Sequence, residues 1–148
     1  MIRVERFTAS LVKDWDGLLD RSRNGTFLLK RDFISYHLHL FNEVSLIVYS
    51  NDEAVAILPL NEKHNLVYSY GGLTYGGLIY KDELRLLQII EIWNACINEL
   101  INSGYAKAIF KLVPEHYVKI PSEESKYALF LLGATIKRVD TALVVNRV

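Results

Sequence analysis

One stretch decides how this chain can be interpreted: Tyr70-Gly71-Gly72-Leu73-Thr74-Tyr75-Gly76-Gly77-Leu78, in which Tyr-Gly-Gly-Leu occurs twice. Glycine has no side chain to bury and loses the most conformational freedom on folding, so this density indicates a sharp turn or a close approach to the backbone. A strand is expected before it, over residues 65–69, and a long helix after it, over residues 82–103. A glycine-rich connection that enters a helix N-terminus can bind an anion, because free N–H groups and the helix dipole favour negative charge there.

The same glycines also have a purely structural interpretation. Paired glycines form β-bulges and tight turns without any ligand. The stretch matches neither G-x-G-x-x-G nor a P-loop, which ends in Gly-Lys followed by Ser or Thr. Taken alone, it therefore predicts a special backbone conformation and leaves a binding role open.

Composition limits the class of protein. The chain has 148 residues, of which 51% are hydrophobic and 23% charged, so residues 1–148 are expected to form a single domain with a sizeable core. Seventeen basic and seventeen acidic residues give a net charge of zero, which argues against nucleic-acid binding through a basic surface and favours self-association or a partner. The single cysteine, Cys96, excludes an internal disulfide framework and is expected to be buried and inert.

Targeting signals are not evident in the sequence. No apolar run reaches the roughly 18 residues that span a bilayer, so no transmembrane segment is expected. The first residues, Met1-Ile2-Arg3-Val4-Glu5-Arg6, lack the apolar core of a signal peptide. We therefore expect a cytoplasmic location.

Alternating and continuous apolar patterns predict the strands. They are expected at residues 2–7, 44–50, 53–60, 66–69, 106–113 and 136–145. Asn51-Asp52 suits a two-residue hairpin turn. The almost uninterrupted apolar run at 106–113 is typical of a central strand, and 136–145 is expected to close the chain as one or two strands.

Apolar residues at helical spacing predict four helices. One follows Ser10, which is placed to cap it, and a second is expected over residues 32–41 after the turn at Asn24-Gly25. The third is the long helix at 82–103, and the fourth starts near Ser122 as its cap. Hairpins therefore come first and a strand–helix–strand unit later, which predicts an α/β (α+β) mixed sheet with helices on both faces.

This order and several motifs resemble the GNAT acyltransferases, in particular the tandem-GNAT branch related to the Fem aminoacyltransferases of cell-envelope polysaccharide gene clusters. The matching segments are Asn24-Gly25-Thr26-Phe27-Leu28, Arg31-Asp32-Phe33, Ala56-Ile57-Leu58-Pro59-Leu60, the glycine-rich stretch, Lys111-Leu112-Val113-Pro114-Glu115-His116-Tyr117 and Glu124-Ser125-Lys126-Tyr127-Ala128-Leu129-Phe130. The resemblance implies a three-layer αβα sandwich with a central, mostly antiparallel sheet.

Two departures from that family qualify what the resemblance implies. Members of the branch are about twice as long, so this chain is expected to correspond to an N-terminal half that pairs with a second GNAT-like half or with a second copy of itself. GNAT acetyltransferases also hold the coenzyme A pyrophosphate on a Gln/Arg-x-x-Gly-x-Gly/Ala loop before a helix. The glycine-rich stretch is expected at the equivalent place but lacks that pattern.

Acyl transfer to an amine requires a cradle for the donor, an acid for the leaving group and a base for the amine. The expected cradle for acetyl-coenzyme A or another acyl-coenzyme A consists of Gly71, Gly72, Thr74, Tyr75, Gly76 and Gly77. Tyr70 and Tyr75 can stack on a flat group, or they can simply pack at a sheet edge.

The expected catalytic residues lie near the end of the 106–113 strand. Tyr117 can protonate a departing thiolate, and His116 can deprotonate an amine, with Glu115 as a second base or a surface residue. Lys111 either extends along the strand to solvent or holds an anionic ligand. No histidine has metal-ligand spacing, no Gly-x-Ser-x-Gly elbow exists, and Glu123-Glu124 suit a helix N-terminus.

Two functions follow. The first is an acyltransferase that moves an acetyl or aminoacyl group from a thioester or ester donor to an amine, on an envelope sugar or peptide precursor. The alternative is a non-catalytic half-domain that binds the acceptor or docks a partner. Zero net charge argues mildly against aminoacyl-transfer RNA as the donor without excluding it.

Overall fold

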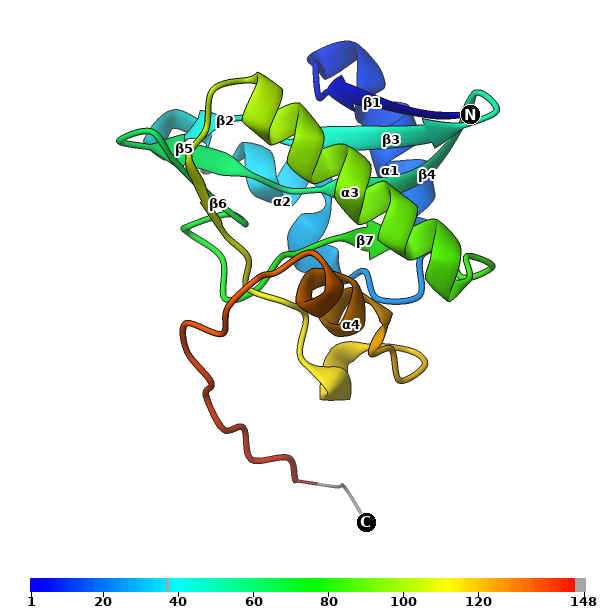
Figure 1. Cartoon of the computed structure of the whole chain (residues 1–148), viewed down its shortest axis with the longest axis vertical. Helices are drawn as coiled ribbons and strands as arrows, with labels where there is room; N and C mark the ends of the chain where they lie inside the picture. Colours follow the sequence, from blue (N-terminus) through cyan, green and yellow to red (C-terminus); the bar gives the residue numbers. More distant parts are fainter. Residues whose placement is uncertain (37, 146–148) are drawn as a thin grey trace.

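Two four-stranded sheets form the centre of the molecule (Figure 1). The computed structural model describes residues 1–36 and 38–145. The first sheet has the strand order β1-β3-β4-β7, and the second has the order β2-β5-β6-β8. All pairs are antiparallel except β6 with β8, which are parallel.

The strands of the first sheet are β1 (Ile2–Arg6), β3 (Leu46–Ser50), β4 (Glu53–Leu58) and β7 (Ile79–Tyr80). Those of the second are β2 (Asn42–Glu43), β5 (Asn61–Lys63), β6 (Leu66–Tyr68) and β8 (Lys107–Ile109). The expected hairpin between β3 and β4 is confirmed, because Ser50 pairs with Glu53 and the two residues between them have φ angles of 48° and 62°. Such angles suit Asn and Asp in a two-residue turn.

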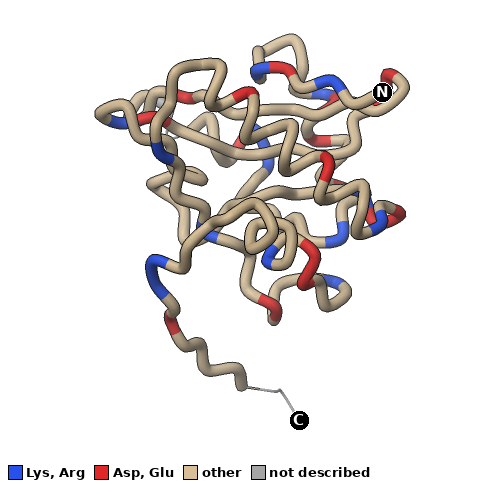
Figure 2. The backbone as a smooth tube through the Cα atoms, viewed as in Figure 1, with Lys and Arg blue, Asp and Glu red and all other residues tan. Residues whose placement is uncertain are grey.

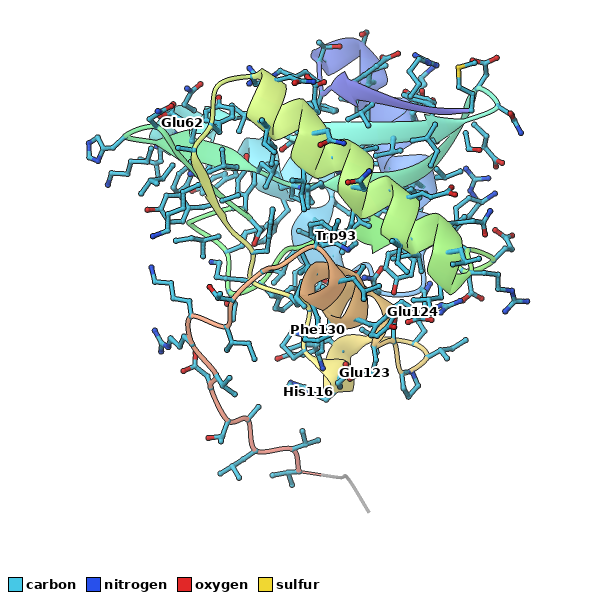
Figure 3. All side chains as sticks on the ribbon, viewed as in Figure 1. Glu62, Trp93, His116, Glu123, Glu124 and Phe130 are labelled. Carbon is cyan, nitrogen blue, oxygen red and sulfur yellow. The ribbon has the colours of Figure 1, made fainter. Side chains whose placement is uncertain are left out.

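Helices lie on both faces of this framework (Figure 1). They are α1 (Val12–Asp20), α2 (Arg31–Ser35), α3 (Leu86–Asn102) and α4 (Glu124–Leu131). Short 3₁₀ turns occur at η1 (Ala9–Leu11), η2 (Phe27–Leu29), η3 (Leu38–Leu40) and η4 (Glu115–Tyr117). α4 packs against α3, where the Trp93 indole N–H donates to Ser125 Oγ at 3.0 Å; Figure 3 shows Trp93 between the two helices.

The alternation in β3 explains why two hydrophobic cores form. Leu46 and Val48 belong to the core under α3 and α4, whereas Ile47 and Tyr49 belong to the core under α1 and α2. Successive side chains of a strand point to opposite faces, so an unbroken apolar strand serves two helical layers. The expected α+β fold, with mostly antiparallel sheets covered on both faces, is confirmed.

The C-terminal segment differs from the sequence prediction. Residues 134–145 contain no strand, and their apolar side chains are exposed, from 60% at Val144 to 99% at Leu143. The expected closing strand is therefore wrong. In Figure 1 the segment leaves the body of the molecule after α4, so its apolar pattern has no sheet to join.

The strand expected at 106–113 is shorter than predicted and is not central. Only Lys107–Ile109 pairs with β6. Among the described residues, β8 is an edge strand of its sheet. The residues that follow β8 lie next to the glycine-rich stretch, and the two segments share one isolated bridge, between Gly76 and Leu112. The ladder ends because its partner leaves the sheet.

The helix starts and ends also differ from prediction. Ser10 does not cap α1, because it lies inside η1 and its hydroxyl contacts Thr8 Oγ1 at 2.8 Å. The helix expected over 32–41 ends at Ser35, and Phe41 instead packs against the Tyr70 ring at 5.9 Å. His37, expected on that helix, lies outside the described residues.

Candidate functional site

The glycine-rich stretch does not enter a helix. It connects β6 to β7, and residues 81–85 then lead to α3, which begins at Leu86. The predicted junction with the helix N-terminus is therefore wrong, because the short strand β7 was not recognised. The stretch is instead a loop between two strands that pair with consecutive strands of the chain, β6 with β5 and β7 with β4.

The first half of the stretch lies at the surface. Gly71 and Gly72 are exposed, as is Thr74. The Gly71 amide donates to Asn61 Oδ1 at 2.5 Å, and a Cβ on Gly72 would lie 2.7 Å from the Phe41 ring. The buried Asn61 side chain and the Phe41 ring thus fix the position of this half.

The second half is buried against the segment that follows β8. The Gly76 amide donates to the Lys111 carbonyl at 2.7 Å, and a Cβ there would lie 2.9 Å from the Ser69 carbonyl oxygen. Gly77 has a φ of 74° and packs against Leu112. Close backbone approach therefore explains these two glycines without a ligand.

Lys111 lies under the stretch. Its ammonium donates to the carbonyl oxygens of Tyr70, at 3.2 Å, and Leu73. Burial lowers the pKa of Lys111. The side chain thus holds the turn at Tyr70–Leu73 and does not run along the strand to solvent.

Three other predicted residues come together. The Tyr75 hydroxyl donates to Thr26 Oγ1 at 2.8 Å, and the Tyr75 ring lies 5.3 Å from the Tyr117 ring. The His116 ring lies 4.3 Å from Tyr117, on η4, and Figure 3 shows it beside α4. Tyr117 is 53% exposed and His116 is exposed as well, so both rings can reach a ligand next to η4.

A narrow cleft opens where two neighbouring segments diverge. Gly76 and Leu112 are bridged in parallel, but β7 and the chain after Val113 then separate. The cleft between them has a volume of about 20 Å³, enough for about one water molecule. Its walls are Asn24, Gly76, Leu78, Tyr80, Leu112, Val113, Glu115, Val118, Ser122, Ser125 and Lys126.

The chain itself covers the outer edge of β7. The Asn24 carboxamide donates to the Leu78 carbonyl at 2.8 Å and accepts from the Tyr80 amide at 3.2 Å. The Arg23 amide donates to the Tyr80 carbonyl at 3.1 Å. Residues 23 and 24 thus take the place of a neighbouring strand, and Asn24 is only 6% exposed.

A charged network adjoins the same cleft through Tyr80 and Ser122, which line it. The Arg23 guanidinium contacts Asp82 at 3.1 Å and Glu124 at 2.7 Å. Ser122 donates to Glu124 Oε2 at 2.7 Å and contacts the Tyr80 hydroxyl.

The electrostatics of the network follow from these contacts. Burial raises the pKa of Tyr80. Burial opposes ionisation of Glu124, but the Ser122 hydroxyl and Arg23 outweigh it and lower the Glu124 pKa. The network therefore holds an ionised carboxylate and a neutral phenol side by side.

Sequence reasoning missed this network. The sequence predicts a turn at Asn24, a helix-dipole role for Glu124 and a helix cap at Ser122. In the structure the N-cap of α4 is Glu123 (labelled in Figure 3), not Ser122. Arg23 and Glu124 are 101 positions apart, so no local pattern joins them. The one available signal was the pair of polar residues at 23–24 in front of Gly25.

The connection from β7 to α3 carries no phosphate-binding pattern. It reads Lys81-Asp82-Glu83-Leu84-Arg85, and the Arg85 amide is already bonded to Gln88 Oε1 at 2.9 Å. Its two carboxylates and two basic side chains leave the segment with no net positive charge to attract an anion. Elsewhere acidic and basic residues are spread along the whole backbone (Figure 2).

The described part of the chain shows neither a metal-binding cluster nor a membrane-spanning helix. Within residues 1–36 and 38–145, no group of three or more His, Cys, Asp or Glu side chains could hold a metal ion. None of the helices in this part of the chain is long and apolar enough to cross a membrane.

Comparison with known proteins identifies the fold. No family model matches the sequence, and no curated protein matches it. Among solved structures, AAC(6')-Iy in complex with the bisubstrate analogue CoA-S-monomethyl-acetylneamine is similar, with a TM-score of 0.62, 12% identity and coverage of 100% of this chain and 99% of that one.

Two further structures agree. The aminoglycoside 6'-N-acetyltransferase AAC(6')-Ih from Acinetobacter baumannii has a TM-score of 0.56 and 13% identity, with 99% of each chain covered. The ribosomal-protein-S18-alanine N-acetyltransferase from Escherichia coli has a TM-score of 0.53 and 13% identity, covering 74% of this chain and 66% of that one. The chain therefore has a GNAT-like α+β fold. These similarities do not point to the tandem or Fem-related branch.

Proposed function

We propose that this chain is an N-acyltransferase domain of the GNAT type, which moves an acetyl or aminoacyl group from a thioester or ester donor to an amine. The observation that carries the proposal is the cleft between β7 and the chain after Leu112, in a fold shared with acetyltransferases. One of those neighbours was solved with an analogue that joins coenzyme A to its acceptor.

The edge of β7 suits the donor chemically. The pantetheine arm of coenzyme A is an extended chain with two amide groups, and such a chain can bind an open strand edge through main-chain hydrogen bonds. The edge offers the carbonyl of Leu78 together with the amide and carbonyl of Tyr80, which are the groups that Asn24 and Arg23 now occupy. Donor binding therefore requires that residues 23–24 withdraw.

We assign the reacting groups to η4. His116 takes the proton from the acceptor amine as its nitrogen attacks the donor carbonyl. The carbon–sulfur bond then breaks, and Tyr117 gives its proton to the departing thiolate. Lys111 holds the glycine-rich turn in place. Tyr75, Gly76 and Gly77 form the adjacent wall, and the exposed Gly71, Gly72 and Thr74 are the surface candidates for the phosphates.

The acceptor and partner are proposals from the family resemblance. An amine on an envelope sugar or peptide precursor is the proposed acceptor. A second GNAT-like half or a second copy of this chain is the proposed partner, supported by the exposed apolar residues of 134–145. Sedimentation at increasing concentration would test self-association, and a monomer at all concentrations would leave only a different chain as partner.

The donor proposal is tested by calorimetric titration of acetyl-coenzyme A into the wild-type chain, Asn24→Ala and the control Asn94→Ala. Asn94 is exposed on α3. If residues 23–24 compete with the donor, removing two hydrogen bonds of about 1 kcal/mol each should tighten binding by roughly 5- to 30-fold in Asn24→Ala. Asn94→Ala should bind like the wild type.

A second function is favoured by the charged network. Arg23, Asp82 and Glu124 fill the space beside α3, and two carboxylates stand where an anion would have to bind. On this alternative the chain is a non-catalytic half-domain that binds the acceptor or docks a partner. Absence of heat and of thermal stabilisation at millimolar acetyl-coenzyme A, in both wild type and Asn24→Ala, would reject donor binding and leave the alternative.

A further inference from the structure

A second pocket lies on the other side of the segment that closes the cleft. It has a volume of about 250 Å³ and is lined by Leu19, Asp20, Gly25, Thr26, Phe27, Lys30 and Lys119. Its lining residues Gly25 and Lys119 directly follow Asn24 and Val118, which line the narrow cleft. A thin wall therefore separates the two spaces.

Hydrogen bonds hold this wall together. The Lys119 amide donates to the Arg23 carbonyl at 3.1 Å, and the Lys119 ammonium donates to the Ser22 carbonyl at 3.1 Å. A Cβ on Gly25 would lie 2.3 Å from Ser22 Oγ and 2.5 Å from Leu19 Cδ1, so a larger residue here would have to displace these two side chains. One side of the pocket is thus fixed by contacts between residues 22–25 and Lys119.

The charges in the pocket do not cancel. Lys30 is paired with Asp20 at 2.5 Å. Lys119 forms no ion pair within the part of the chain that the structure describes, and it uses one of its three ammonium protons on Ser22. Two lysines and one aspartate leave one positive charge facing the pocket.

Thr26 and Phe27 complete the recognition chemistry. Thr26 Oγ1 already accepts a hydrogen bond from the Tyr75 hydroxyl, so its own proton is left to donate to a ligand oxygen. Phe27 is 69% exposed, with its ring 5.8 Å from Phe33. An ammonium and a hydroxyl donor next to an exposed ring suit an anionic group carried on a flat or aliphatic body.

We propose that this pocket binds a small molecule in which a phosphate or carboxylate is attached to a ring or short apolar body. Lys119 and Thr26 hold the anion, and Phe27 covers the apolar part. The site is distinct from the donor cleft, and the proposal does not depend on acyl transfer.

The test uses phenyl phosphate and benzoate as probes, with benzyl alcohol and inorganic phosphate as the uncharged and ring-free comparisons. Binding is followed by amide chemical shifts in the ¹⁵N-labelled wild-type chain. The proposal expects saturable shifts at Gly25, Thr26 and Lys119, with tighter binding of a ring-bearing anion than of either comparison probe. Whichever of phenyl phosphate and benzoate binds more tightly shows whether the pocket prefers a phosphate or a carboxylate.

Variants separate the contributions. Lys119→Met keeps the apolar stem and should weaken binding of the better probe by roughly tenfold or more. Phe27→Ala, at an exposed site, should weaken it by roughly threefold or more. Lys137→Met removes an equal charge from the exposed segment 134–145 and should change nothing.

Three results would overturn the proposal: no saturable shift in the wild type at 20 mM probe as a rough upper limit, shifts that avoid Gly25 and Thr26, or equal loss of affinity in Lys119→Met and Lys137→Met. The wild-type shifts decide the matter even if Lys119→Met does not fold. Since no coenzyme A is present, failure here leaves the donor titration unaffected.

Discussion

Replacing Glu43 by Gln should destabilise the chain strongly, because Glu43 neutralises a buried arginine. The Arg31 side chain is 3% exposed and makes a two-pronged contact with Glu43, at 2.6 and 2.9 Å. The Arg31 guanidinium also lies over the Phe7 ring, 3.8 Å from its centre, so it cannot turn to solvent without unpacking that ring. Breaking a buried pair by removing one partner typically costs about 3–5 kcal/mol.

The expected loss for Glu43→Gln is near the lower end, about 3 kcal/mol, because the Gln oxygen can still accept one hydrogen bond. That is a large part of the roughly 5–15 kcal/mol by which a domain is stable. Urea unfolding followed by tryptophan fluorescence measures it, and Trp15 is a local reporter since the Arg31 guanidinium lies 5.0 Å from its ring.

Two further variants make the reasoning refutable. In Arg31→Met/Glu43→Leu no charge is left buried, so the double variant should be more stable than Glu43→Gln. Asp140→Asn breaks the exposed pair of Arg138 and Asp140, and should leave the unfolding midpoint unchanged. A loss below about 1 kcal/mol for Glu43→Gln, or a double variant less stable than the single one, would refute the assignment.

Three other outcomes are expected. Burial raises the pKa of Cys96 to about 12, so a thiol reagent at pH 8 should label it only as fast as the chain unfolds, and immediate labelling without urea would contradict its burial. The pKa of Lys111 is lowered in the folded chain, so at a pH just below the ordinary lysine pKa of 10.5 the unfolded chain binds more protons than the folded chain. The free energy of unfolding should therefore rise with pH in that window, and Lys111→Met should flatten the rise. Gly76→Ala should lower the free energy of unfolding by about 1–3 kcal/mol. Gly17→Ala, in helix α1 with open space around its Cβ position, should raise it by about 0.5–1 kcal/mol, and the urea denaturation midpoints of the two variants measure the difference.

The sequence predicted those parts of the fold that depend on local patterns. The β3–β4 hairpin follows from two apolar runs joined by Asn51-Asp52, and α3 follows from its long apolar stripe. Strands of two or three residues, such as β7, carry too few positions for a pattern to be recognised. Their pairing depends on where β4 places its partner, which is tertiary information.

The candidate site was predicted only in part. The predicted Tyr75, His116 and Tyr117 do lie together, because two of them are adjacent in the chain and the third lies in the most conspicuous motif. Their roles in binding and in proton transfer stay a prediction. The polar pair at 23–24 indicates only a turn, since a carboxamide that takes the place of a strand looks like any other turn residue in a sequence.

The hydrogen bonds of Asn24 also bear on solubility. An uncovered strand edge is a template on which another chain can add a strand, and natural sheets protect such edges. Here the Asn24 carboxamide and the Arg23 amide together saturate the outer edge of β7 between Leu78 and Tyr80, in a chain whose net charge of zero provides no net repulsion between copies. We therefore expect Asn24→Ala to expose part of this edge and to raise the turbidity of concentrated solutions relative to the wild-type chain.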